Sequence, residues 1–432
     1  MDSRLVVAAT AETPGSRPSL SAHGLFVILG ATAIALLATP LASPAMPEIA
    51  RVFADQAESE PFARAILGAI SILPGDPSVA FLVKFILLSI PALFIILGAP
   101  FVGWLSDNWG RKGLLNVSLV VFGISGVSGY FADTFFFMFI GRAILGLSIA
   151  GIKTATVAMV GDFYEGPRRN KVIGWQGTAM KLGGVVFMLL GGFLANYGWH
   201  VPFLGYLIAY LVLPSGLLAL SESLPARGAV DERRASSVNL PEIPFWPSAY
   251  VFVSAFLASG LFFVTPVQLP FFLRSSFEVA PFQLGLAIAL GNSVGALVSL
   301  AYYKFRARMN FVAIYAVIFF SMAVGYYTLT LATGYYSSLV GMVLAGVGFG
   351  LYVPNQSAWI LSVVSAQRRG FGVGLVTTAM FLGQFSSPIL VQPFIDPANL
   401  DSVWRAVSTI LIVLAILYAV LSRFGGPLNR ET

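Results

Sequence analysis

The chain has 432 residues, of which 57% are hydrophobic and only 10% are charged, and its formal net charge is +6. Because soluble globular proteins carry about 25% charged residues, this composition indicates an integral membrane protein. Basic loops on one side of the membrane explain the positive charge, so we expect no nucleic-acid partner. The absence of cysteine excludes disulfides and thiolate metal sites, and His23 and His200 fall near predicted helix ends. We therefore expect neither a metal nor a cofactor.

The predicted elements begin after an N-terminal tail, residues 1–22, which has no long apolar core and no convincing signal-peptide cleavage site. Twelve apolar runs follow, each of about 20 residues, the length that a helix needs to span a bilayer. Their approximate centres are Ala35, Ile90, Gly123, Ile149, Met188, Leu211, Gly260, Leu290, Phe320, Gly346, Met380 and Leu414. The sequence therefore predicts twelve transmembrane helices.

Polar segments divide these helices into two lobes. The longest polar segment, residues 221–247, follows the sixth run and is interpreted as a cytoplasmic linker. The first lobe is then residues 23–220 and the second is residues 248–425, with a C-terminal tail at residues 426–432. We predict an all-α integral membrane fold of two pseudo-symmetric six-helix lobes, surrounded by the lipid bilayer.

The basic residues indicate how the chain is oriented. Most Lys and Arg fall in the loops on the side of the termini, and the opposite side keeps only Arg51, Arg64, Arg274 and Arg405. Since basic loops remain on the cytoplasmic side, we predict a protein of the cell (inner, cytoplasmic) membrane with both termini in the cytoplasm. The long first external loop, about residues 51–77, is partly apolar and is interpreted as an amphipathic segment on the outer surface.

The two lobes repeat each other at a constant offset of 200 residues, as RRNKVIGWQGTAMKLGG from Arg168 and RRGFGVGLVTTAMFLGQ from Arg368 show. Parallel six-helix repeats are typical of two-lobed transporters with a substrate site at the midplane between the lobes. The repeat also pairs basic residues of the first lobe with apolar residues of the second: Arg142 with Met342, Lys153 with Val353 and Lys181 with Phe381. The fold therefore does not need these charges, which favours a functional role for each of them.

A loop after the second predicted span carries a recognisable motif. The segment GWLSDNWGRKGLL starts at Gly103 and contains Asp107, Arg111 and Lys112. Its spacing, G-x-L-x-D-x-x-G-R-K, resembles the signature loop of the major facilitator superfamily, between the second and third helices. In that family the loop helps to latch the cytoplasmic side during alternating access. The resemblance implies this gating role for Asp107 and Arg111, and by extension for Gly103 and Lys112.

Two further segments resemble the twelve-helix drug–proton antiporters of the same family. ATPLASPAMPEIARVF in the first span is similar to their proline-containing first-helix motif. GRAILGLSIAG is similar to their fourth-helix motif, with Arg142 as its arginine. The resemblance covers about residues 25–424, nearly the whole chain, and implies a transporter of the drug and metabolite efflux branch.

Ionisable residues inside membrane helices are costly and usually functional, and Arg142, Lys153 and Lys181 lie well inside predicted spans. Arg142 and Lys153 are eleven residues apart, about three helical turns, so they share one helix face. For Arg142, a structural pair with Glu48 is an equal alternative to a functional role. Lys84 lies near the outer start of the second span and is expected to extend to the membrane surface.

Lys181 shares its helix face with Gly174, Gly177 and Gly184, and small residues mark the side of a membrane helix that packs against protein. We expect its ammonium group to face into the bundle, with capping of carbonyl groups on a neighbouring helix as the alternative. No Asp or Glu lies near the middle of a predicted span, and a cavity with cations but no carboxylates attracts anions. One hypothesis is that Lys153 or Lys181 carries a coupling proton.

The second lobe contributes neutral polar residues within its predicted spans. Such groups, among many aromatic residues, suit an amphiphilic ligand. Together with the three basic residues of the first lobe, we assign to substrate binding Gln268, Tyr352, Asn355, Gln356 and Gln384. Asn292 is left open, because a hydrogen bond between helices explains it at least as well.

These features predict a secondary active transporter that works by alternating access as a monomer. We expect it to export a small amphiphilic anionic or zwitterionic compound, with protons as a candidate coupling ion. The alternative within transport is a proton-coupled multidrug exporter of neutral or cationic lipophilic compounds. A membrane receptor or membrane-embedded enzyme ranks lower. The sequence offers no cysteine, inner histidine or carboxylate pair for catalysis, and the tails are short for a signalling domain.

Overall fold

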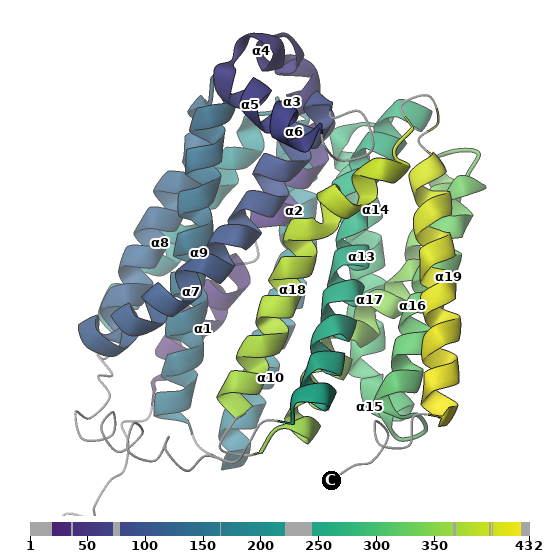
Figure 1. Ribbon diagram of the computed structural model, residues 1–432. Coiled ribbons are helices and arrows are strands. Elements are labelled where there is room, and N and C mark those ends of the chain that lie inside the picture. Colours follow the sequence, from purple (N-terminus) through teal and green to yellow (C-terminus); the bar gives the residue numbers. More distant parts are fainter. Residues whose placement is uncertain are drawn as a thin grey trace, which may run out of the picture.

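The computed structural model describes residues 20–35, 38–71, 78–164, 166–220, 244–365, 369–396, 399 and 401–424. Within these residues the chain forms a bundle of long helices packed side by side. Helices of the first half, coloured purple to blue, lie beside helices of the second half, coloured green to yellow (Figure 1). Most of the predicted N-terminal tail and linker, and all of the predicted C-terminal tail, lie outside the described residues.

The first lobe runs from α1 to α11. Its helices are α1 (Ala22–Ile34), α2 (Ala38–Ala42), α3 (Met46–Val52), α4 (Ala54–Ser59), α5 (Pro61–Ile70), α6 (Val79–Lys84), α7 (Ile90–Trp109), α8 (Arg111–Val127), α9 (Phe135–Phe163), α10 (Gly166–Ala195) and α11 (Ala209–Ala219). Short 3-10 turns occupy Ser43–Ala45, Ser128–Phe131 and Val201–Ile208. A π-helical segment, Phe85–Ser89, joins α6 to α7 as one continuous span.

The second lobe runs from α13 to α19. Its helices are α13 (Phe245–Phe277), α14 (Pro281–Leu300), α15 (Tyr302–Arg306), α16 (Phe311–Thr330), α17 (Tyr335–Val363), α18 (Arg369–Val391) and α19 (Asp401–Phe424), with a 3-10 turn at Gln392–Phe394. Among the described residues, 11 helical segments are long and apolar enough to cross a membrane, or 12 if one bent pair is counted as a span. The predicted all-α membrane fold is therefore confirmed.

The first span is the bent pair. Its two parts, Ala22–Ile34 and Thr39–Val52, are inclined to each other by 48°. Pro40, Pro44 and Pro47 lie in the second part, and a proline cannot donate the backbone hydrogen bond that a regular helix requires. This part is accordingly divided into α2, a 3-10 turn and α3.

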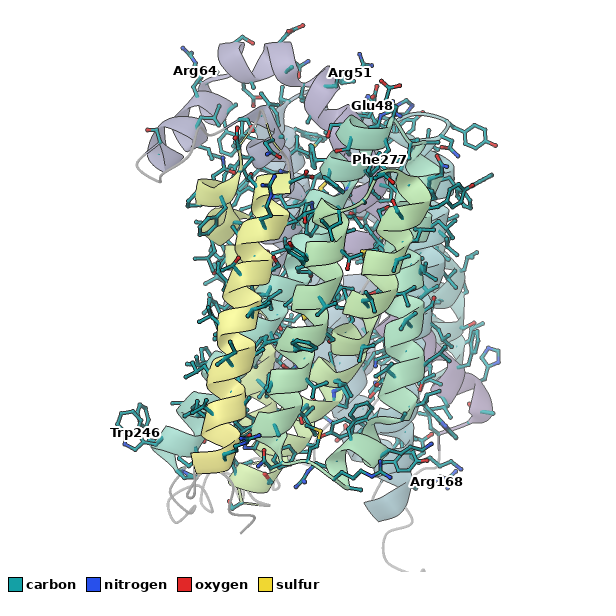
Figure 2. All side chains as sticks on the ribbon, turned by 90° about the vertical axis from the view of Figure 1, so that its right-hand side faces the viewer. Glu48, Arg51, Arg64, Arg168, Trp246 and Phe277 are labelled. Atoms are coloured by element: carbon teal, nitrogen blue, oxygen red, sulfur yellow. The ribbon has the colours of Figure 1, made fainter. Side chains whose placement is uncertain are left out.

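The two ends of the bundle differ in what covers them. We call the end over which α3, α4 and α5 lie the cap face, which is at the top of Figure 1. The opposite end, where α15 lies and α19 ends, is the tail face. Arg51 and Arg64 lie at the cap face and Arg168 lies at the tail face (Figure 2). These three residues lie at the ends where the loop pattern predicts them.

The lobes come very close to each other near the cap face, where α10 crosses α14. A Cβ atom on Gly192 would lie 3.0 Å from the carbonyl oxygen of Pro281, and one on Gly285 would lie 2.7 Å from that of Met188. Glycines of this kind let the backbones of two membrane helices touch. Nearer the tail face on α10, a Cβ atom on Gly177 would meet no atom within 4 Å. The close approach of α10 to the second lobe at Gly192 is therefore not repeated at Gly177.

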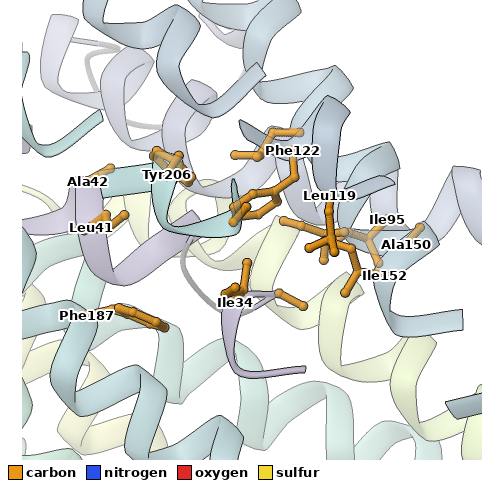
Figure 3. Packing of buried hydrophobic residues seen from close by; sticks show 14 of the residues in the cluster. Ile34, Leu41, Ala42, Ile95, Leu119, Phe122, Ala150, Ile152, Phe187 and Tyr206 are labelled. Atoms are coloured by element: carbon orange, nitrogen blue, oxygen red, sulfur yellow. The ribbon is translucent and has the colours of Figure 1, made fainter. Parts of the chain in front are cut away.

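A packed core supports the first-lobe side of the space between the lobes. Leu119 and Phe122 of α8 lie in one cluster of buried side chains with Ile95 of α7 and Ile152 of α9 (Figure 3). Because lipid tails are as apolar as these side chains, close packing rather than exclusion from water holds such helices together. Ile95 also faces the space between the lobes, so the core fixes the position of that wall.

The segment between the first two spans folds as α4 and α5 at the cap face. The Glu60 carboxylate accepts hydrogen bonds from the backbone N–H groups of Phe135 and Phe136, at 2.8 and 2.9 Å, and so caps the N-terminus of α9. The ring of Phe62 packs edge-on against those of Phe136 and Phe139. The outer segment predicted from the sequence is therefore helical and is docked on the first lobe.

We expect Glu60→Ala to lower the apparent melting temperature of the purified protein, followed by tryptophan fluorescence. Two backbone N–H groups would lose the carboxylate that accepts their hydrogen bonds and complements the helix dipole. This loss should lower the free energy of unfolding by about 1–2 kcal/mol. Asp55→Ala, at an exposed carboxylate of α4, is the control and should melt like the wild type. Equal melting of the wild type and Glu60→Ala would contradict this docking.

Candidate functional site

A cavity of about 290 Å³ lies between the lobes and is lined by both of them. Its walls come mainly from α2, α7, α9 and α10 of the first lobe and from α13, α14, α17 and α18 of the second. Most of the lining residues are apolar. The polar ones are Thr39, Lys153 and Lys181 on the first lobe, and Ser259, Thr265, Asn292, Tyr352 and Gln384 on the second. Both charged groups of the lining thus belong to the first lobe.

Lys181 lies on the glycine face of α10, as the sequence predicts. Gly177 and Gly184, four residues before and three residues after it, also line the cavity, and a Cβ atom on either would meet no atom within 4 Å. The Lys181 Nζ is buried and has no hydrogen-bond partner among the described residues. Because an ammonium group has three N–H donors, a bound molecule with acceptor oxygens would complete this position.

Lys153 reaches the cavity from α9 and contacts the other lobe. Its Nζ lies 4.4 Å from the centroid of the Phe381 ring, which is within the range of a cation–π interaction. Phe381 is the residue that the repeat pairs with Lys181, so the second lobe presents a ring where the first presents a charge. The structure therefore brings both predicted lysines to one cavity, facing an aromatic wall.

Arg142 lies on α9 but is not among the residues that line the cavity. Its side chain is fully buried in the first lobe, where Nη1 donates to the Tyr206 hydroxyl at 3.0 Å and Nη2 donates to the Gly126 carbonyl at 2.9 Å. The alternative partner, Glu48, instead pairs with Arg51 at 2.5 Å. In this conformation the Arg142 side chain extends toward α8 and makes structural contacts outside the cavity lining, and its role in substrate binding stays a prediction.

Two of the predicted neutral residues of the second lobe, Tyr352 and Gln384, line the cavity. The Gln384 side-chain amide donates to the first lobe, to Thr39 Oγ1 at 3.5 Å and to the Leu88 carbonyl at 3.4 Å. Asn292, which the sequence left open, also lines the cavity. These groups supply hydrogen-bonding capacity without charge.

Three other predicted residues, Gln268, Asn355 and Gln356, are not part of the lining. The Asn355 amide accepts from the Tyr302 hydroxyl at 3.1 Å and donates to the Phe311 carbonyl at 3.0 Å, so it joins helices within its own lobe. Gln356 is fully buried. Polarity within a span identified these residues, but it does not show which face of the helix turns to the cavity.

Lys84 does not extend to the membrane surface, and that expectation was wrong. Only 4% of the residue is exposed, because α13 of the second lobe covers it. Its Nζ donates to Gln268 Oε1 at 2.6 Å and lies 4.3 Å from the centroid of the Phe271 ring. The contact joins the two lobes on the cap-face side of the cavity.

The signature-like loop forms a corner between α7 and α8 at the tail face. Gly110 has a φ of 99°, a conformation that residues with a side chain rarely adopt. Arg111, the first residue of α8, forms an ion pair with Asp162 near the end of α9 and donates to the Ala158 carbonyl at 3.3 Å. Asp162 was not among the predicted site residues, because no local pattern connects it to a loop 51 positions earlier.

The other three residues of the predicted gate lie on the two helices that meet at this corner. A Cβ atom on Gly103 would meet no atom within 4 Å, so no close helix approach depends on this glycine in the described conformation. Lys112 follows Arg111 on the first turn of α8. Asp107 lies in α7, and its side chain is outside the described part of the chain.

Comparison with known proteins is consistent with this arrangement. The sequence profile of the Major Facilitator Superfamily matches residues 28–388 and, in a second match, residues 251–430. The quinolone resistance protein NorA of Staphylococcus aureus (strain MRSA252) is 23% identical over 341 residues, which cover 76% of this chain and 84% of NorA. Multidrug resistance protein 2 of Bacillus subtilis (strain 168) is 25% identical over 317 residues, which cover 69% of this chain and 76% of that protein.

Solved structures show the same fold. The human organic anion transporter MFSD10 (TETRAN) superposes with a TM-score of 0.65 at 19% identity, and the match covers 92% of this chain and 99% of that one. At this level of identity the likeness concerns the fold alone.

We expect Arg142→Met to destabilise the protein without weakening ligand binding by the folded fraction. The change removes the guanidinium group that donates to the Tyr206 hydroxyl and the Gly126 carbonyl in an apolar interior, at a cost of about 1–3 kcal/mol. The measurements are the apparent melting temperature and the dissociation constant for 2-naphthoate, a small aromatic anion used as the test ligand. Lys171→Met, at an exposed lysine of α10, is the control. An unchanged melting temperature together with weakened naphthoate binding would instead support a role of Arg142 in substrate binding.

Proposed function

Because the chain belongs to the major facilitator superfamily, we propose that it exports a small amphiphilic organic anion or zwitterion by alternating access of the cavity between its lobes. The family makes the chain a multi-span membrane transporter rather than an enzyme. The identity of the substrate class and the mechanism are the parts that are proposed.

The position of Lys153 and Lys181 is the observation that carries the proposal. Both line one cavity, and no Asp or Glu is among its described lining residues. A cation in such a low-dielectric space interacts much more strongly with an anion than it does in water. The Lys181 Nζ has no hydrogen-bond partner among the described residues, so a carboxylate or similar group would supply the missing acceptors.

The rest of the lining favours a ligand with an apolar body. Phe262, Phe263, Phe349 and Phe381 offer ring faces, and Tyr352 adds a hydroxyl group. Pockets for small organic ligands are usually apolar, with a few polar groups that orient the ligand, and the smallest have volumes of about 300 Å³. A volume of about 290 Å³ therefore suits a small aromatic compound. MFSD10, which is described as an organic anion transporter and has the same fold, is consistent with this class.

The transport cycle proposed here uses the two faces of the bundle. We propose that the tail face and both termini are cytoplasmic and that the cell membrane is the location, since basic loops usually remain on the cytoplasmic side. The close contact of α10 with α14 near the cap face supports a cavity that is reached from the cytoplasm in this conformation. The loop residues Gly103, Asp107, Arg111 and Lys112 would then control closure of the cytoplasmic side. A monomer and proton coupling complete the proposal.

A second candidate is a proton-coupled multidrug exporter of neutral or cationic lipophilic compounds. The names of the relatives, a quinolone resistance protein and a multidrug resistance protein, fit it at least as well. The many aromatic and methionine side chains of the lining would also accept varied apolar ligands. The two candidates differ in one respect that can be measured, the sign of the preferred charge.

We expect purified wild-type protein to bind 2-naphthoate at least about tenfold more tightly than 2-naphthylmethylammonium, which has the same ring and the opposite charge. Lys181→Met should weaken naphthoate binding by about tenfold, because a charge-assisted hydrogen bond is lost. The same change should leave binding of the cation unchanged or stronger. Isothermal titration calorimetry in nanodiscs measures both ligands.

Lys171→Met provides the matched control for this experiment. It removes an exposed lysine from the same helix, away from the cavity lining, and should change neither affinity. Tighter binding of the cation by the wild type would favour the multidrug candidate. Naphthoate affinity that is equal in the wild type and Lys181→Met would remove the basis of the anion proposal.

A further inference from the structure

One buried cation, Lys84, lies outside the cavity and links the two lobes. Its Nζ donates to Gln268 Oε1 at 2.6 Å and lies 4.3 Å from the centroid of the Phe271 ring. Lys84 is 4% exposed and Gln268 is 6% exposed, so water does not compensate for the buried charge. No described carboxylate lies within 4.0 Å of the Lys84 ammonium group.

The buried charge is only partly satisfied by these contacts. An ammonium group has three donors, and the structure gives it one neutral amide oxygen and one ring face. The Gln268 Nε2 atom is itself buried and has no hydrogen-bond partner among the described residues. The contact therefore closes the lobes over a cation that would gain by meeting water or an anion.

The helices on both sides of the contact are irregular at this point. Lys84 is followed directly by the π-helical segment Phe85–Ser89, and such segments are frequent at functional sites. On α13, Gln268 lies between Pro266 and Pro270. Because Pro270 has no N–H group, the Pro266 carbonyl is free to accept a hydrogen bond from Ser43 of the first lobe, at 2.6 Å.

The contact lies on the way from the cavity to the cap face. Pro91 lines the cavity, and Lys84 precedes it by seven residues on the same span, which corresponds to about 10 Å along the helix. Pro266 also lines the cavity, two residues before Gln268. An anion that leaves the lysines of the cavity toward the cap face would meet Lys84 next.

We propose that Lys84 is a second anion-binding position, held by Gln268 while the cap face is closed and available to the outgoing anion when the lobes separate there. This inference rests on the proposed function, since it names the position that the exported anion takes after Lys153 and Lys181. Gln268 stands in for the anion in the closed state, and release of Lys84 from it favours opening.

Four proteins test the proposal: the wild type, Lys84→Met, Gln268→Leu and the double variant. Gln268→Leu removes the one hydrogen-bond acceptor that the described residues give to this buried charge, so it should favour separation at the cap face and make Lys84 available. We expect 2-naphthoate to bind Gln268→Leu about tenfold more tightly than the wild type. The double variant should lose this gain, and Lys84→Met alone should bind naphthoate no more tightly than the wild type.

Distances across the cap face provide a readout that needs no ligand. The chain has no native cysteine, so spin labels can be attached at Tyr197→Cys of the first lobe and Tyr336→Cys of the second, both exposed. Double electron–electron resonance measures the distance between the two labels. This distance should be longer in Gln268→Leu and equal to that of the wild type in the double variant. Gln176→Leu is the matched control, since Gln176 is also 6% exposed but bonds within the first lobe, to Thr32.

Each result decides between the two proposals. Opening and tighter binding in Gln268→Leu that both disappear with Lys84→Met support the second anion position. Tight binding that survives in the double variant, or no change in Gln268→Leu, overturns it, while continued dependence on Lys181 would keep the proposed function. If the tighter binding by Gln268→Leu is lost with Lys84→Met but is unaffected by Lys181→Met, the second anion position is kept and the proposed function is overturned. No naphthoate binding by any of the proteins overturns both.

Discussion

The cost of holding positive charge inside an apolar bundle is the constraint on which the rest of this structure depends. Each buried cation needs a partner from the protein or from a bound molecule. Arg142 donates to oxygen atoms of its own lobe, and Lys84 donates to one amide oxygen of the other lobe. Lys153 has an aromatic ring, and Lys181 has no hydrogen-bond partner among the described residues. The four cations thus differ in how many protein partners they have, from Arg142, which links helices of one lobe, to Lys181, for which a bound ligand would supply the acceptors.

Backbone irregularity decides where the lobes can exchange such partners. Inside a bilayer a carbonyl group that loses its helical donor must find another one. The carbonyl of Pro266 finds it in Ser43, on the proline-broken first span of the other lobe. Gly192 and Gly285 bring two further backbones together near the same face. The contacts that close this face therefore lie where the helices deform most easily, which is what an interface that opens and closes requires.

The sequence predicted the elements and some of the site, but not the partners. The length of the apolar runs and the internal repeat were sufficient to predict the fold. The glycines on one face of α10 indicated that Lys181 faces into the bundle, where it lines the cavity. Helical spacing placed Arg142 on the same helix face as Lys153, yet it could not show that the guanidinium group bonds to Gly126 of α8. Likewise, Lys84 and its acceptor are 184 residues apart, and no local pattern connects them. Periodicity reports a helix face, whereas a partner depends on which helix of which lobe packs against that face.

The asymmetry of the repeat underlies the proposed preference of the cavity for a ligand with both a charge and an apolar body. The first lobe contributes both lysines of the lining, and the second contributes Phe262, Phe349 and Phe381 with neutral polar groups. Lys153 already lies over Phe381, so a cation and a ring meet across the lobes before any ligand is bound. An amphiphilic anion fits this division with its charge toward the first lobe and its apolar body toward the second. Such a ligand would contact both lobes at once, and its binding would therefore respond to any change in the angle between them.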